Sequence, residues 1–189
     1  TKEMTMSVLY RPLTYDDLAQ MPDDGKRYEV IDGELLVNPS PAKPHQKIQK
    51  RLGDLLLSQE KSGAGEVYFA PVDVRLSPYD IVQPDLLFLL PHRSHIYHLS
   101  GVVEGPPDIV VEILSPSTRN IDQIRKAALY ARGGVPEYWI ADPDTPSLTI
   151  FALRQGQYHQ VAAEAGAARS LILPDLTIDL DALFQDLSR

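Results

Sequence analysis

The sequence predicts an α/β (α+β) fold in which a mixed central β-sheet is flanked by helices, with a β-hairpin near the N-terminus. Short β-branched apolar runs alternate along the chain with stretches whose apolar residues have helical spacing. The Asp32-Gly33 pair separates two short apolar stretches, which is typical of a hairpin turn. The run from Asp108 to Leu114 is almost continuously apolar, as expected for a central strand buried on both faces.

The length of 189 residues suits one domain. We expect residues 1–10 to form a flexible leader and residues 11–189 to form the domain. No apolar run has the length of a membrane helix, and residues 1–9 lack the apolar core of a secretion signal. We therefore expect a cytoplasmic protein without a membrane partner. The absence of cysteine excludes disulfides, thiolate metal sites and a cysteine nucleophile.

In the first half of the chain, the expected elements begin with a short helix. Thr14 has the N-cap position, with acidic Asp17 three residues later, and the helix stops before Pro22. The hairpin over residues 28–37 comes next. Helical spacing of apolar residues then predicts a helix over residues 45–57.

Strands and two further helices make up the rest of the predicted fold. Proline, glycine and Asp-Pro pairs separate the segments and mark their ends. The expected segments are strands over 66–76 (bent at Pro71) and 81–90, a loop over 91–105, a strand over 108–114, a helix over 121–132, strands over 137–141 and 148–153, a pairing segment over 158–163 and a helix over 180–187.

The charge pattern leaves two interpretations open. The net charge of −8 has the wrong sign for binding nucleic acid. Basic residues nevertheless cluster in two places, which are Lys43, Lys47, Lys50 and Arg51, and then Arg119, Arg125, Lys126 and Arg132. These clusters either bind a phosphate backbone or form ordinary solvated helix faces.

Glu112 is the most informative residue, because it lies in the middle of an apolar strand. A buried carboxylate without a partner is costly, and its usual partner is a cation or a metal. Asp85 opens the preceding apolar strand. Since consecutive strands usually lie side by side, the two carboxylates can converge. Two converging carboxylates make a site for a hard cation such as magnesium.

These residues also resemble a known family. Pro84-Asp85 followed by Glu112-Ile113-Leu114 matches the spacing of the PD-(D/E)XK nuclease superfamily. The wider motifs are similar to the Uma family of restriction-endonuclease-like proteins, over roughly residues 11–180. They are R-Y-E-V-I-D-G-E-L at 27–35, A-P-V-D-V-R-L at 70–76, Q-P-D-L at 83–86, D-I-V-V-E-I-L-S-P-S-T at 108–118 and K-A-A-L-Y-A-R-G-G-V-P-E-Y-W-I-A-D-P at 126–143.

The resemblance implies a restriction-endonuclease-like fold and metal-assisted hydrolysis of phosphodiester bonds, most simply in DNA. Asp85, Glu112 and the carbonyl of Ile113 would bind Mg²⁺, for which Mn²⁺ can substitute. Leu114 stands where the superfamily has a lysine, and Lys126 is the candidate replacement on the next helix. Alternatively, Lys126 forms a surface salt bridge with Asp122, four residues earlier.

Five further residues are candidates for the site. They are Glu29 as an additional carboxylate, His45 at a helix start, Asp73 on a strand, Ser115 after the Glu112 strand, and Tyr130 on the same helix face as Lys126. Each also has an ordinary structural interpretation, such as a surface histidine, a turn cap or a strand acid.

Two alternatives concern the whole protein and one concerns a histidine-rich loop. The fold can persist without catalysis, as a nucleic-acid-binding or oligomeric interaction module. The resemblance also implies a homodimer, in which two sites cut two strands. His92, His95 and His98 invite a zinc hypothesis, although we favour a polar surface loop.

Overall fold

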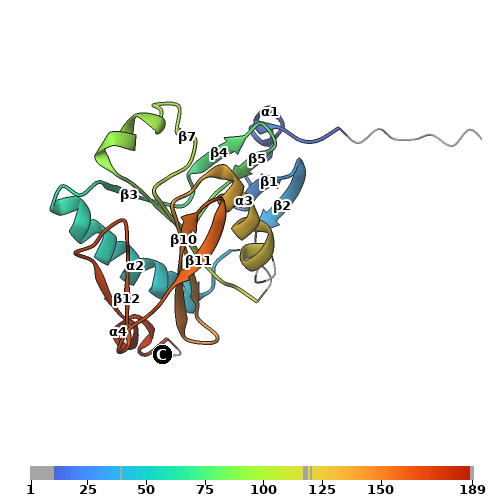
Figure 1. Ribbon diagram of the computed structural model, residues 1–189. Helices are drawn as coiled ribbons and strands as arrows, with labels where there is room; N and C mark the ends of the chain where they lie inside the picture. Colours follow the sequence, from blue (N-terminus) through green and yellow to red (C-terminus); the bar gives the residue numbers. More distant parts are fainter. Residues whose placement is uncertain (1–10, 39, 117–118, 120, 188–189) are drawn as a thin grey trace, which may run out of the picture.

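Figure 1 shows the computed structural model, which describes residues 11–38, 40–116, 119 and 121–187. The leader expected over residues 1–10 lies outside the described residues. Among the described helices, none combines the length and the apolar character needed to cross a membrane.

A five-stranded sheet contains the predicted hairpin. Its strand order is β2-β1-β5-β4-β7, and only β4 and β7 pair in parallel. The bounds are β1 (Arg27–Ile31), β2 (Glu34–Asn38), β4 (Asp73–Ser77), β5 (Asp80–Val82) and β7 (Val102–Glu104). Asp32 and Gly33 have φ values of 54° and 77°. The hairpin therefore turns through two left-handed residues, as its Asp-Gly pair predicts.

A six-stranded sheet forms the centre of the molecule. Its order is β11-β10-β9-β8-β6-β3, and β8 pairs with β9 in parallel. The bounds are β3 (Glu66–Phe69), β6 (Leu86–Leu89), β8 (Ile109–Ile113), β9 (Glu137–Asp142), β10 (Ser147–Arg154) and β11 (Gln157–Val161). A separate two-stranded sheet pairs β12 (Ala167–Arg169) with β13 (Thr177–Asp179).

The helices have the approximate positions that the sequence predicts, except for η1, which lies where a loop was expected. They are α1 (Tyr15–Leu18), α2 (Lys43–Lys61), the 3-10 helix η1 (Pro91–Ile96), the π-helix η2 (Ile121–Lys126), α3 (Ala127–Gly133) and α4 (Leu180–Phe184). Thr14 caps α1 in a capping box with Asp17, as expected.

Two apolar cores lie on opposite faces of the six-stranded sheet. On one face, Leu52 of α2 packs in a cluster with Phe88 and Val111. On the other face, Leu129 of α3 packs in a cluster with Val110. Figure 1 shows α2 and α3 on either side of these strands. Side chains alternate between the two faces along β8, so each position along this strand faces one helix or the other.

The fold class is confirmed, but several boundaries differ. The strands expected over 66–76 and 81–90 are each divided between the two sheets, with breaks at Pro71 and Pro84. Proline has no N–H to donate to a ladder, so a strand is interrupted there. The helix expected over 121–132 begins as a π-helix, and the loop expected over 91–105 contains η1 and β7.

Gly65 provides a test of the packing between α2 and the central sheet. A Cβ at this position would overlap the carbonyl oxygen of Leu89 and the ring of Phe88, whereas a Cβ at Gly63 would meet nothing within 4 Å. Gly65→Ala should lower the free energy of unfolding by about 1–3 kcal/mol more than Gly63→Ala. Urea denaturation of both variants measures this difference. Equal losses would contradict the close approach.

Candidate active site

Asp85 and Glu112 lie opposite each other where the ladder between β6 and β8 ends. The antiparallel register pairs Leu86 with Val111, so continuing it by one residue brings Asp85 opposite Glu112. Directly opposed residues point to the same face of a sheet. The Ile113 amide donates a 2.8 Å hydrogen bond to Asp85 Oδ2, in place of a backbone carbonyl. The Asp85 carboxylate therefore closes this end of the ladder.

Glu112 points to the face of the central sheet that α3 covers. Side chains alternate between the two faces along β8, and Val110, two residues earlier, lies on the α3 face. Lys126 Nζ donates a 2.9 Å hydrogen bond to Glu112 Oε1, and the Tyr130 hydroxyl donates one of 2.6 Å to the same oxygen. Lys126 and Tyr130 therefore lie on one helix face and both bind Glu112, as their spacing of four residues predicts. The side chain of Asp122, the alternative partner of Lys126, lies outside the described residues.

Glu29 forms a second ion pair with the Lys126 amine, in addition to the one with Glu112. The Glu29 carboxylate is fully buried on β1, and its Oε1 lies 3.0 Å from Lys126 Nζ. The backbone amide of Gln83 also donates to Oε1 at 2.6 Å, and Asn38 Nδ2 donates to Oε2 at 2.6 Å. Both oxygens of Glu29 therefore have donors from the protein, and Glu29 is connected to the cleft through Lys126.

Asp85 is held by two further side chains. Arg27 Nη1 donates to Asp85 Oδ1 at 2.9 Å, and His45 Nε2 lies 3.0 Å from Oδ2. Burial opposes ionisation of Asp85, but the hydrogen bond and charge of His45 and the charge of Arg27 outweigh it and hold the pKa of Asp85 below its ordinary value. Asp85 is therefore a carboxylate at neutral pH.

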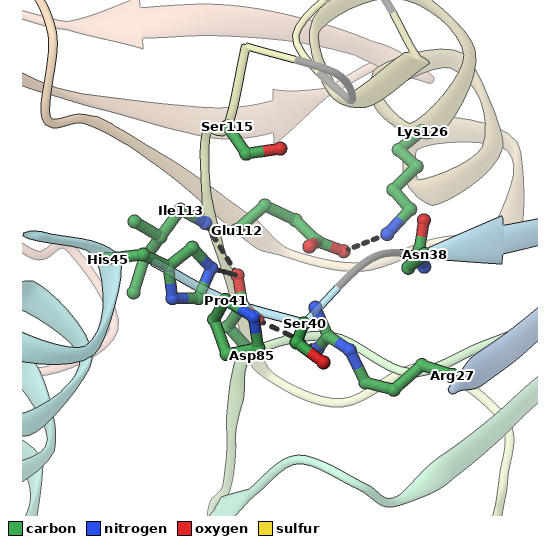
Figure 2. A pocket seen from close by; sticks show the side chains of 10 residues that line it. All are labelled: Arg27, Asn38, Ser40, Pro41, His45, Asp85, Glu112, Ile113, Ser115 and Lys126. Atoms are coloured by element: carbon green, nitrogen blue, oxygen red, sulfur yellow. Dashed lines mark hydrogen bonds and ion pairs between the residues drawn. The ribbon is translucent and has the colours of Figure 1, made fainter. Parts of the chain in front are cut away.

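These side chains line a cleft, which Figure 2 shows from close by. It contains most of the residues that the sequence singles out. The lining residues are Arg27, Asn38, Ser40, Pro41, His45, Asp85, Glu112, Ile113, Ser115 and Lys126. Glu29 and Tyr130 lie behind the lining and are bonded to it. Asp73 is not in the lining; it accepts a 2.8 Å hydrogen bond from Gln83 Nε2.

Comparison with known proteins identifies the family. Residues 15–181 match the family model Uma2, described as "putative restriction endonuclease". The chain belongs to the Uma2 family. A crystal structure described as a "putative nuclease belonging to DUF820", from Anabaena variabilis ATCC 29413, has the same fold, with a TM-score of 0.77 at 19% identity. The match covers 93% of this chain and 99% of the Anabaena chain. No curated protein matches the sequence.

The donor atoms of this Uma2 cleft fit a hard divalent cation. Asp85 and Glu112 offer carboxylate oxygens at one point of the sheet, and Ile113 adds a backbone carbonyl nearby on the same strand. Oxygen donors of this kind suit Mg²⁺ and Mn²⁺. In the part of the chain that the structure describes, no three His, Cys, Asp or Glu side chains cluster as metal ligands. The remaining ligands would therefore be water or substrate, and the loop histidines do not form a zinc cluster.

The cleft contains residues that sequence reasoning missed. Arg27 is two residues before Glu29, so both side chains lie on the same face of β1. This alternation could have indicated Arg27 once Glu29 was a candidate. Asn38 pairs with Arg27 across the hairpin. Its position follows from the hairpin register and could also have been found. Ser40 lies in the Pro-rich loop, where no sequence pattern points to a site.

Internal contacts hold two residues of the first basic cluster and most of the second, while Lys43 and Lys50 are exposed. In the first, Lys47 donates to the carbonyl of Asp186, and Arg51 donates to carbonyls of the C-terminal segment. In the second, Arg119 pairs with Asp142 and Asp144, Arg125 with Glu34, and Arg132 with Asp32 and Asp80. The acidic partners neutralise most of the second cluster, whereas the first cluster keeps its charge, and the two interpretations of that cluster both stay open.

Lys126 should stabilise this site strongly, because it separates two buried carboxylates. Lys126→Met would leave Glu29 and Glu112 without their shared cation and should lower the free energy of unfolding by about 3–5 kcal/mol. Lys50→Met, at an exposed position on α2, is the matched control and should change stability by about 0.5 kcal/mol or less. Urea denaturation at pH 7 checks both. Equal stability of the two variants would mean that the buried ion pairs do not form.

Proposed function

We propose that this protein is a metal-dependent endonuclease that hydrolyses phosphodiester bonds in DNA, with Mg²⁺ as its ion and Mn²⁺ able to replace it. One observation carries the proposal. Asp85 and Glu112, which are 2% and 3% exposed, face each other at the end of a ladder, with a lysine amine 2.9 Å from Glu112. Membership of the Uma2 family supports nuclease activity.

Asp85, Glu112 and the carbonyl of Ile113 would hold the ion. His45 and the Ile113 amide orient Asp85 through hydrogen bonds to Oδ2. Such fixed ligand orientation strengthens metal sites. A divalent ion bound there supplies Lewis-acid polarisation of the scissile phosphate and a lower pKa for an attacking water.

Lys126 is the candidate for stabilising charge in the transition state. Its ammonium group lines the cleft and is fixed by Glu29 and Glu112 on two sides. A fixed cation beside the scissile phosphate stabilises the negative charge that develops on the phosphoryl oxygens. Tyr130 and Glu29 are positioning residues in this scheme. Ser115 also lines the cleft, and its hydroxyl would contact a phosphate oxygen of a bound substrate.

A non-catalytic nucleic-acid-binding module is the second candidate. Leu114 stands where the superfamily has lysine. Its side chain is 2% exposed and packs in an apolar core cluster. Such a module would bind nucleic acid without cutting it. The homodimer and the cytoplasmic location stay predictions, and sedimentation velocity tests the first of them.

Cleavage of a mixed panel of duplex and single-stranded DNA and RNA tests the activity. We expect cutting of DNA with Mg²⁺ or Mn²⁺ and none with a chelator. Asp85→Asn and Glu112→Gln should each reduce the rate by roughly 10²–10³-fold or more, because each removes a charged ligand of the ion. Asp54→Asn, an exposed acid on α2, is the control and should cut like the natural protein.

Two results of that assay would contradict the proposal. Cutting that persists equally in Asp85→Asn and Glu112→Gln would exclude this cleft as the active site. Tight binding of nucleic acid without cutting, in the presence of either metal, would favour the non-catalytic module.

A further inference from the structure

Arg27 is the first residue of the R-Y-E-V-I-D-G-E-L motif, and the proposed chemistry gives it no contact with the substrate. It begins β1, its side chain is 23% exposed, and its Nη1 donates to Asp85 Oδ1 at 2.9 Å. Figure 2 shows the guanidinium beside Asp85, joined to it by a dashed line. Arg27 also lines the adjoining hollow, which extends past Ser40 to Gln49 and Pro71. The guanidinium therefore stands between the carboxylates and a second, open part of the surface.

The observed contacts leave Arg27 incompletely satisfied. Its Nε is buried and has no hydrogen-bond acceptor among the described residues. A buried donor without an acceptor costs about 1–3 kcal/mol. The planar guanidinium can bind a carboxylate or a phosphate through two donors at once. A ligand that offers paired oxygens would therefore bind this guanidinium better than Asp85 does through a single Nη1 contact.

Arg27 also binds the oxygen of Asp85 that a metal ion would bind. Oδ2 of Asp85 is already engaged by His45 and the Ile113 amide. Oδ1 is the oxygen that Arg27 holds. A divalent ion and a guanidinium at the same oxygen compete for it and repel each other. Binding of the ion at Oδ1 would therefore displace the Arg27 guanidinium from Asp85.

We propose that Arg27 and the divalent ion compete for Asp85 Oδ1, and that the displaced guanidinium binds a backbone phosphate of the nucleic acid in the adjoining hollow. This inference rests on the proposed function, since it names the residue that links its metal to its substrate. Without metal, Arg27 neutralises Asp85 and is withheld from phosphate. With metal, the same residue holds the substrate beside the carboxylates. Metal and nucleic acid therefore bind cooperatively through Arg27.

The competition is tested by titrating Mn²⁺ into the protein by calorimetry, without nucleic acid. Arg27→Met should tighten Mn²⁺ binding about tenfold, because the ion no longer displaces a charge-assisted hydrogen bond. Arg27→Lys, which keeps the charge in a shorter side chain, should give a smaller gain. Arg125→Met is the matched control, since Arg125 pairs with Glu34 and does not line the cleft, and it should change the affinity less than about twofold. Unchanged Mn²⁺ affinity in Arg27→Met would overturn the competition.

The phosphate contact is tested without any metal, by fluorescence anisotropy with labelled DNA and a chelator. Asp85→Asn releases Arg27 and should tighten DNA binding about tenfold, through a charge-assisted contact to phosphate. Asp54→Asn removes one exposed acid and should have little effect. The gain should disappear in the double variant Asp85→Asn, Arg27→Met. Circular dichroism confirms that each variant is folded.

The outcomes separate this inference from the proposed function. A gain in Asp85→Asn that persists without Arg27 would overturn the phosphate contact, even if the protein cuts DNA with metal. Conversely, a gain that depends on Arg27 would support the contact even if no cleavage is found. Two results together would establish both the competition and the phosphate contact. They are tighter Mn²⁺ binding in Arg27→Met and loss of the gain in DNA affinity in the double variant.

Discussion

The hydrogen bond from the Ile113 amide to Asp85 Oδ2 is the contact on which the geometry of the cleft depends. β6 begins at Leu86, and the pairing of Leu86 with Val111 is the last position of its ladder with β8. A buried amide without an acceptor is costly, and the Asp85 carboxylate supplies the acceptor from a side chain. The same contact fixes Asp85 opposite Glu112. The two carboxylates therefore converge at the position where the ladder ends.

Charge balance then determines which side chains surround this pair. Glu29, Asp85 and Glu112 are each 3% exposed or less, so their charges need cations close by. Lys126 forms ion pairs with Glu29 and Glu112, while Arg27 forms one with Asp85. The two cations come from elements that are far apart in the sequence, η2 and β1. The five-stranded and six-stranded sheets are therefore joined at the cleft by ion pairs as well as by packing.

The sequence predicts that Asp85 and Glu112 converge, because a glutamate within an apolar strand and an aspartate at the start of its neighbour point to one end of the paired strands. Lys126 follows from family resemblance rather than from periodicity. The partition of the strands between two sheets could not be predicted, since alternation shows which residues are buried and not which sheet buries them. The partners of the basic clusters could not be predicted either. Arg132, for example, pairs with Asp32 and Asp80, which lie far away in the sequence.

The most direct test of the central claim is the anomalous scattering of Mn²⁺ in crystals of the protein. We expect one strong peak between Asp85 and Glu112, with oxygen ligands that include the Ile113 carbonyl. We also expect the peak to be absent from crystals of Asp85→Asn. A cleft that stays without a peak at saturating Mn²⁺, or a peak held by other residues, would contradict the assignment of this carboxylate pair as the metal site.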